Sequence, residues 1–133
     1  MILIIGGAYQ GKKAYARDLF GGSFIDGAKC PLEELFSCRG IYYFHEYVKR
    51  WMESERTLEK GTELDEVLAN QIIQQNPEVV IISNEIGCGI VPMDAGERRW
   101  RELVGRTMTH LAAFSGEVHR VVCGIGTVIK QKE

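Results

Sequence analysis

The residues with the clearest chemical potential lie at the start of the chain, where the apolar run 2–5 leads directly into a glycine-rich segment. Its spacing, Gly6-x-x-x-x-Gly11-Lys12, is that of a phosphate-binding loop. The glycines let backbone N–H groups face phosphate oxygens, the lysine adds a full positive charge, and the following helix presents its positive N-terminus. The pattern predicts a bound nucleoside triphosphate, ATP or GTP. The residues expected to hold it are Gly6, Gly7, Ala8, Tyr9, Gln10, Gly11, Lys12 and Lys13.

One position of this loop departs from the motif. Lys13 stands where Ser or Thr normally offers a hydroxyl to Mg²⁺, and an ammonium group cannot ligate a cation. The sequence therefore predicts no metal ligand in this loop, and whether nucleotide binding requires Mg²⁺ stays open. One hypothesis has Lys13 supplying part of the charge that the metal would bring. The alternative for the whole segment is a glycine-rich turn that joins a strand to a helix and binds no ligand.

A second informative segment, Ser-Asn-Glu-Ile-Gly-Cys-Gly-Ile-Val-Pro at 83–92, follows an apolar run at 79–82. If that run is a strand of an open parallel sheet, the segment leaves its carboxyl end, where ligands bind in such sheets. Two glycines allow close approach to a ligand, and the neighbouring Asn84 and Glu85 offer polar groups. An ordinary strand-to-helix turn has a similar composition, so the pattern by itself leaves both interpretations open.

The elements that must position these segments alternate between short apolar runs and longer amphipathic stretches. This alternation predicts an α/β fold with a mostly parallel sheet and flanking helices. Strands are predicted at 2–5, 23–25, 41–44, 79–82, 118–123 and 128–130, the last two as a hairpin that turns at 124–126. Helices are predicted from the loop to residue 20, at 31–36, through Trp51 and Met52, from a capping box of Thr62 and Asp65 to a stop at Pro77, and at 95–115.

Length and composition narrow the class of protein. At 133 residues, 45% hydrophobic and 26% charged, the chain is predicted to form one domain with a real core. A net charge of −2 with dispersed basic residues gives no reason to expect nucleic acid or an anionic membrane as a partner. Four cysteines without metal-binding spacing predict reduced thiols in a cytoplasmic protein. The first apolar run is too short for a signal peptide or a membrane span.

Three segments together point to a family. They are Gly6, Gly7, Gly11 and Lys12 in the loop, Asn-Glu-x-Gly-x-Gly-Ile-Val-Pro at 84–92, and Arg-x-Trp-Arg-Glu-x-x-Gly-Arg at 98–106. In these motifs, and in Glu-Val-x-x-Val-Val-x-Gly-Ile at 117–125, the chain resembles the adenosylcobinamide kinase/adenosylcobinamide-phosphate guanylyltransferase family of cobalamin biosynthesis.

This resemblance implies a RecA-like P-loop fold, a homo-oligomer that is commonly a trimer, and a two-step reaction on a corrinoid. A nucleotide first passes its terminal phosphate to the aminopropanol hydroxyl of cobinamide; GTP then guanylylates a histidine, and the GMP moves to the phosphorylated cobinamide. The catalytic residues that it implies are Lys12, Glu46 and Glu85. The substrate-binding residues that it implies are Asn84, Gly87, Gly89, Pro92, Arg98 and Arg101.

The chain also departs from the family pattern. Gln10 and Lys13 replace the two serines of the family's loop. The region between the second and third predicted strands is shorter than in the family, and the helix that carries the guanylylated histidine falls in that region. No residue matches this histidine. His45 is a candidate for the role, against the ordinary interpretation of a histidine at a strand end that makes a backbone hydrogen bond.

Two of the expected residues have a second interpretation. Arg98 and Arg101 could address phosphates, or they could form i,i+4 ion pairs with Glu102 and Glu97 on a solvated helix face. His110 and His119 show no pattern that assigns them a function.

Two hypotheses for the function therefore remain open. The first is a nucleotide-dependent cobinamide kinase, with or without guanylyl transfer. The second is a catalytically degenerate relative that binds nucleotide or corrinoid in an assembly or regulatory role. Lys13 and the unmatched histidine favour the second hypothesis, whereas the intact segment at 84–92 favours the first.

Overall fold

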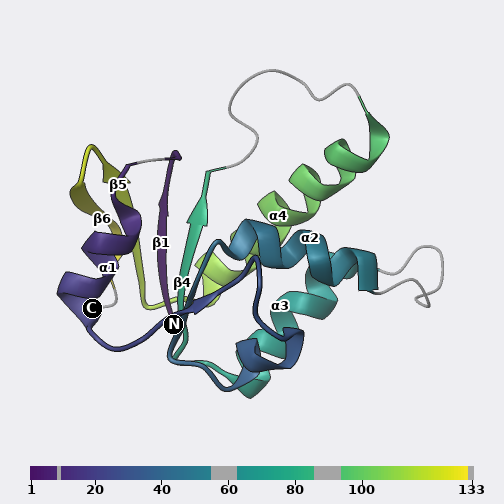
Figure 1. The fold of residues 1–133 in the computed structure, drawn as a ribbon, viewed down its shortest axis with the longest axis horizontal. Helices are drawn as coiled ribbons and strands as arrows, with labels where there is room; N and C mark the ends of the chain where they lie inside the picture. Colours follow the sequence, from purple (N-terminus) through teal and green to yellow (C-terminus); the bar gives the residue numbers. More distant parts are fainter. Residues whose placement is uncertain (9, 55–62, 86–93, 132–133) are drawn as a thin grey trace.

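The computed structural model describes residues 1–8, 10–54, 63–85 and 94–131. Its strands are β1 (Ile2–Gly6), β2 (Ile25–Asp26), β3 (Gly40–Tyr42), β4 (Val80–Asn84), β5 (Glu117–Val122) and β6 (Ile125–Gln131). They form one six-stranded sheet in the order β2-β3-β4-β1-β5-β6. All neighbouring pairs in it are parallel except β5 and β6, so the predicted α/β fold with a mostly parallel sheet is confirmed (Figure 1).

Local signals explain where the helices begin and end. The helices are α1 (Lys12–Phe20), α2 (Phe44–Ser54), α3 (Leu64–Gln75) and α4 (Ala95–Phe114), with a short 3-10 helix, η1 (Leu32–Phe36). α1 ends at Gly21, whose φ of 59° suits a residue without a side chain and whose N–H bonds to Arg17 O. Asp94 caps the start of α4, because its side chain accepts a hydrogen bond from the Glu97 amide.

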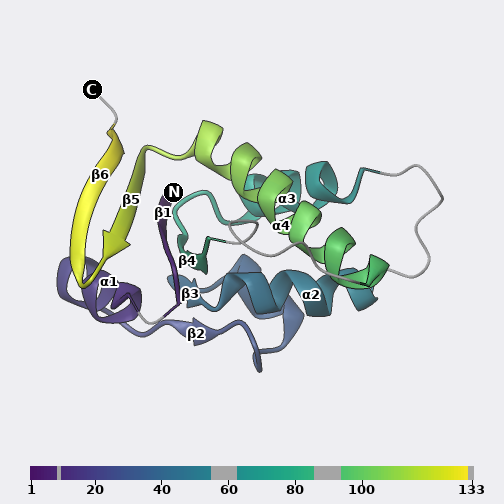
Figure 2. The same cartoon turned by 90° about the horizontal axis from the view of Figure 1, so that it is seen from above.

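The helices cover the two faces of the sheet unequally. Because side chains alternate along a strand, Leu3 and Ile81 belong to the large core that they share with residues of α2, α3 and α4. Ile4 and Ile82 belong to a smaller core, which contains Ala16 of α1. Figure 2 shows α2, α3 and α4 gathered together, away from α1.

This arrangement creates a switch point in the sheet. β1 leads into α1 on one face, whereas the neighbouring β4 precedes α4 on the other face. Ligands of open α/β sheets bind at the carboxyl ends of strands whose connections part in this way. The last residues of the two strands, Gly6 and Asn84, are partners in the ladder, so the two segments identified in the sequence meet at this point.

Two predicted boundaries were wrong because of residues with left-handed backbone. The third strand ends at Tyr42 instead of residue 44, since Tyr43 has a φ of 54° and Phe44 already begins α2. The final hairpin turns at Cys123 and Gly124, with φ angles of 52° and 77°, instead of at 124–126. Positive φ at both central residues is what a two-residue type I′ turn requires.

The other differences are smaller. β2 begins at Ile25 instead of residue 23. The predicted capping box is wrong in its described part, because Glu63 precedes α3 without a side-chain cap and Asp65 Oδ2 instead lies 2.8 Å from His110 Nε2. Within the described ranges, no helix combines the length and apolar character needed to span a membrane.

Candidate nucleotide-binding site

A cleft of about 460 Å³ lies between the start of α1 and the carboxyl ends of β3 and β4. Its lining includes the basic side chains Lys12, Lys13 and Arg17 of α1, together with Tyr42 and Tyr43 at the end of β3. Asn84 and Ile82 of β4 line it as well, together with the loop residues Ala8, Gln10 and Gly11. The cleft therefore combines cations suited to phosphates with an aromatic surface.

The glycines of the loop are required by close backbone approaches. A Cβ on Gly6 would lie 2.4 Å from the carbonyl oxygen of Val121, so this position admits no side chain without a shift of β5. Gly11 precedes α1 with a φ of 85°, in the left-handed region that favours glycine. The two glycines that define the motif are therefore required for different reasons, Gly6 by the close approach of β5 and Gly11 by its left-handed backbone.

Lys12 holds its charge inside the loop. It is 8% exposed, and its Nζ donates a hydrogen bond to Gly7 O at 2.6 Å. Burial lowers the pKa of Lys12, and the negative charge of Glu85 opposes that shift. The ammonium group thus lies where the loop would present phosphates, on the first residue of α1.

Lys13 lies on the β3 side of the cleft. Its Nζ is 3.9 Å from the centroid of the Tyr42 ring, which is a cation–π contact. The Lys13 side chain therefore packs against the Tyr42 ring, whereas the Lys12 ammonium group lies in the loop, bonded to Gly7 O. Arg17, one helical turn further along, also lines the cleft.

The β5–β6 hairpin braces the loop and α1 from the other side. Gln10 accepts both amides of the hairpin turn, that of Cys123 on Oε1 at 2.6 Å and that of Gly124 on its backbone oxygen at 2.8 Å. The Tyr15 hydroxyl lies 2.7 Å from Nδ1 of the buried His119. Neither contact was expected from the sequence, because both join residues more than 100 positions apart.

The polar residues at the end of β4, Asn84 and the following Glu85, have different surroundings. Asn84 lines the cleft. The Glu85 amide donates to Gly6 O at 2.8 Å, and its carboxylate faces Arg120, with 2.8 Å from Nε to Oε1. Glu85 does not line the cleft, although its charge acts on Lys12.

His45 makes the backbone hydrogen bond that the ordinary interpretation anticipated. Nδ1 of this residue, which is 6% exposed, accepts the Asn84 amide at 3.3 Å. The neutral ring then carries its proton on Nε2, so neither nitrogen offers a free lone pair to a phosphate. Burial lowers the pKa of His45, as does the charge of Lys12, whereas Glu46 raises it.

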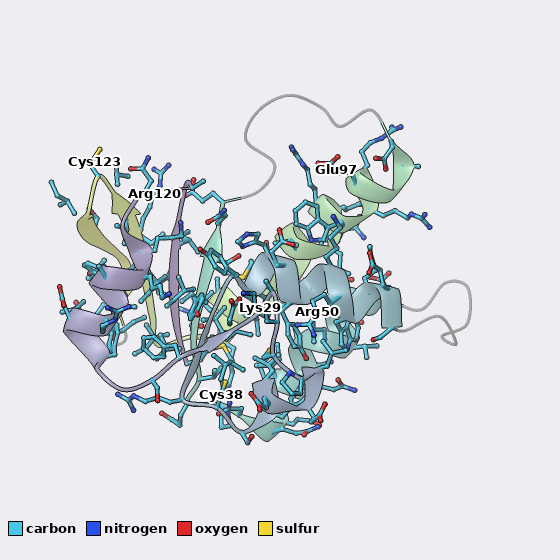
Figure 3. The ribbon with its side chains drawn as sticks, viewed as in Figure 1. Lys29, Cys38, Arg50, Glu97, Arg120 and Cys123 are labelled. Atoms are coloured by element: carbon cyan, nitrogen blue, oxygen red, sulfur yellow. The ribbon has the colours of Figure 1, made fainter. Side chains whose placement is uncertain are left out.

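The remaining predicted residues lie further from this cleft. Glu46 is a half-exposed residue in the first turn of α2, with Oε1 3.9 Å from His45 Nε2. Arg98 and Arg101 lie near the start of α4, and Arg101 Nη2 is 3.6 Å from Glu97 Oε1, as the ion-pair alternative expected. Figure 3 shows Glu97 far from Arg120 and Cys123, which lie on the side of the strand ends.

Some predicted site residues cannot be placed in the cleft, and some residues that line the cleft were not predicted. Tyr9, Gly87, Gly89 and Pro92 fall outside the described residues. Arg17 and Tyr43 line the cleft but were not predicted. Arg17 could have been predicted, because residues at i,i+4 such as Lys13 and Arg17 lie on the same face of a helix. No local pattern indicated that the side chain of Tyr43 lines the cleft.

Comparisons with known proteins place the chain in a family. A sequence model of the family described as "Cobinamide kinase / cobinamide phosphate guanyltransferase" matches residues 35–129, which is more than half of the chain and begins after the glycine loop. Two curated proteins are 47% identical over 53 residues, namely the "Bifunctional adenosylcobalamin biosynthesis protein CobU" of Escherichia coli K12 and that of Salmonella typhimurium LT2. The match covers 40% of this chain and 29% of each relative.

Proposed function

The chain belongs to the cobinamide kinase / cobinamide phosphate guanyltransferase family, and on that basis we propose that it acts as one P-loop domain that transfers the terminal phosphate of ATP or GTP to cobinamide. The observation that carries this proposal is the position of Lys12. Its ammonium group lies in a glycine loop at the switch point of the sheet, beside a cleft lined by Asn84. Because the cleft opens beside Lys12, an acceptor bound in it would lie next to the terminal phosphate that the loop would hold.

Phosphoryl transfer in this site is a matter of position and charge. The loop amides and Lys12 would hold the terminal phosphates, while Lys13 and Arg17 would balance the charge that spreads over the phosphoryl oxygens. The bond from the phosphorus to the bridging oxygen of the nucleotide breaks, and one to the acceptor oxygen forms. Asn84 would orient the acceptor, and the acceptor proton would pass through water to one of the two proposed carboxylates, Glu85 or Glu46, since neither lines the cleft.

The donor set around the loop does not fit a metal held by protein side chains. Lys13 replaces the hydroxyl ligand, and no group of three or more His, Cys, Asp or Glu side chains is assembled among the described residues. The positive charge beside the phosphates would instead come from the basic side chains of α1 that line the cleft.

Guanylyl transfer is the second candidate activity, and the two steps separate in one experiment. Incubation with cobinamide and γ-labelled ATP or GTP should give labelled cobinamide phosphate, whereas α-labelled GTP should leave no covalent GMP on the protein. Adduct formation would add the second step of the family reaction. Failure to form either product would leave a protein that binds nucleotide or corrinoid without turnover.

We also propose that the protein is a homo-oligomer, a trimer by resemblance to its family. Apolar side chains on the hairpin support this proposal, since Ile125 is 71% exposed and Ile129 is 56% exposed. Sedimentation of the wild type should give a multiple of the 15.0 kDa chain mass, and Ile125→Lys should shift it toward the monomer. A wild type that sediments as a monomer would contradict this proposal.

A further inference from the structure

The backbone of Tyr43, between β3 and α2, is unusual for such a large residue. Its φ of 54° lies in the left-handed region, where a bulky side chain is rare and costs conformational energy. Residues held in this way are found at functional sites more often than elsewhere, because the surrounding structure must maintain them.

Two sets of contacts maintain this conformation. The Gly27 amide donates to Tyr42 O at 2.8 Å, and a Cβ on Gly27 would lie only 2.4 Å from Tyr43 O. On the other side, Tyr43 O accepts hydrogen bonds from two amides in the first turn of α2, those of Glu46 at 3.0 Å and Tyr47 at 3.1 Å. The strand thus turns into the helix within a single residue.

The turn places two consecutive side chains in one cleft. Along a regular strand, neighbouring residues point to opposite faces, yet Tyr42 and Tyr43 both line the cleft beside the loop. The ring of Tyr42 is already covered by Lys13 Nζ, whereas Tyr43 is 48% exposed. Edge contacts with Tyr42 and His45, at centroid distances of 5.1 and 6.0 Å, orient the Tyr43 ring.

The position of this ring indicates which ligand it serves. In a P-loop the lysine reaches the terminal phosphates, so an acceptor hydroxyl must approach from beyond Lys12. The cleft provides that approach, because Asn84 and Tyr43 line it together with Lys12. An exposed aromatic ring offers a flat apolar surface, which matches a large conjugated acceptor better than it matches a phosphate.

We propose that Tyr43 is a substrate-contacting residue whose ring packs against the acceptor and thereby sets acceptor affinity. This inference rests on the proposed function, since it takes the acceptor to be the corrinoid. The nucleotide, held by the loop and Lys12, should not depend on this ring.

Two variants test the proposal. Tyr43→Asn removes the ring but keeps a residue that adopts left-handed φ readily, and Tyr43→Phe keeps the ring as a matched control. The KM for cobinamide should rise about tenfold in the Asn variant and stay near the wild-type value in the Phe variant. The KM for nucleotide should change in neither, and the Asn variant should melt at or above the wild-type temperature because strain is relieved.

Equilibrium dialysis of cobinamide, followed by its absorbance, separates this inference from the proposed kinase activity. If the wild type binds cobinamide without phosphorylating it and the Asn variant loses that binding, the kinase proposal fails and the role of Tyr43 holds. Unchanged acceptor affinity in the Asn variant, a loss of nucleotide affinity in its place, or a wild type that binds no cobinamide would each overturn the inference.

Discussion

Glu85 and Arg120 meet across the carboxyl end of β1, with Arg120 Nε 2.8 Å from Glu85 Oε1 and Nη2 3.3 Å from Oε2. Glu85 follows β4 and Arg120 lies in β5, so the pair bridges the two neighbours of β1. Because Arg120 is more than half exposed, the pair contributes at most about 1 kcal/mol to stability. The main consequence of the pair is electrostatic, because Arg120 holds the Glu85 carboxylate in one position and the negative charge of Glu85 acts on Lys12.

We expect Glu85→Gln to separate binding from catalysis. Removing a negative charge close to Lys12 should tighten ATP binding several-fold, measured by isothermal titration calorimetry. If Glu85 also receives the acceptor proton, the same change should lower kcat about 100-fold. Glu53→Gln, at an exposed position in α2, is the charge-matched control. Weaker ATP binding by the Glu85 variant would contradict the electrostatic argument.

Lys12→Met should weaken transition-state stabilisation far more than Lys29→Met does. The buried ammonium group at the loop is expected to contribute about 10²- to 10³-fold to kcat/KM for the nucleotide. The fold should tolerate the change, because burial already disfavours this charge. Lys29→Met, at an exposed site, controls for the loss of one positive charge. A kcat/KM for ATP that is equal in the two variants would exclude Lys12 from the site.

Lys13→Ser restores the hydroxyl that the motif usually carries. If Lys13 supplies charge in place of a metal, wild-type affinity for ATP should change little when EDTA replaces Mg²⁺. The Ser variant should bind ATP more weakly in EDTA and regain affinity with Mg²⁺, because a hydroxyl can ligate the cation. Strictly Mg²⁺-dependent binding by the wild-type protein would count against this role of Lys13.

His45 makes stability depend on pH in a predictable direction. Its folded-state pKa lies below the ordinary value of 6.5, so the unfolded chain binds more protons in the window just below that pH. The free energy of unfolding should therefore decrease as the pH falls from about 6.5 toward the lowered pKa. His45→Asn keeps an acceptor for the Asn84 amide without titrating, and urea unfolding between pH 5 and 8 should show a shallower decline. If the free energy of unfolding depends on pH in the same way in both proteins, His45 is not the source of the pH dependence.

Tyr15→Phe should destabilise the contact between α1 and the hairpin. The change leaves Nδ1 of the buried His119 without its hydroxyl partner, which costs about 1–3 kcal/mol. Tyr43→Phe removes a hydroxyl from a half-exposed ring and should stay within about 0.5 kcal/mol of the wild type. Equal chemical denaturation midpoints for the two variants would show that the hydroxyl of Tyr15 contributes nothing.

Several features were predictable because their causes are local. The loop could be identified because Gly6, Gly11 and Lys12 act through backbone freedom and charge at fixed spacing. The long helix α4 could be identified from its apolar periodicity, and Gly21 marked the end of α1. The family was recognised because its motifs are contiguous, and the family match confirmed it.

Only the tertiary structure decided what these groups contact. Residues distant in sequence pair Glu85 with Arg120 and Gln10 with the hairpin turn, and no periodicity encodes such contacts. The left-handed backbone of Tyr43 depends on Gly27 and α2, so the sequence around β3 by itself indicated a longer strand. The sequence by itself determined which residues form the glycine loop and begin α1, because spacing and residue type suffice there. The sheet and its packing decided which side chains share the cleft with it.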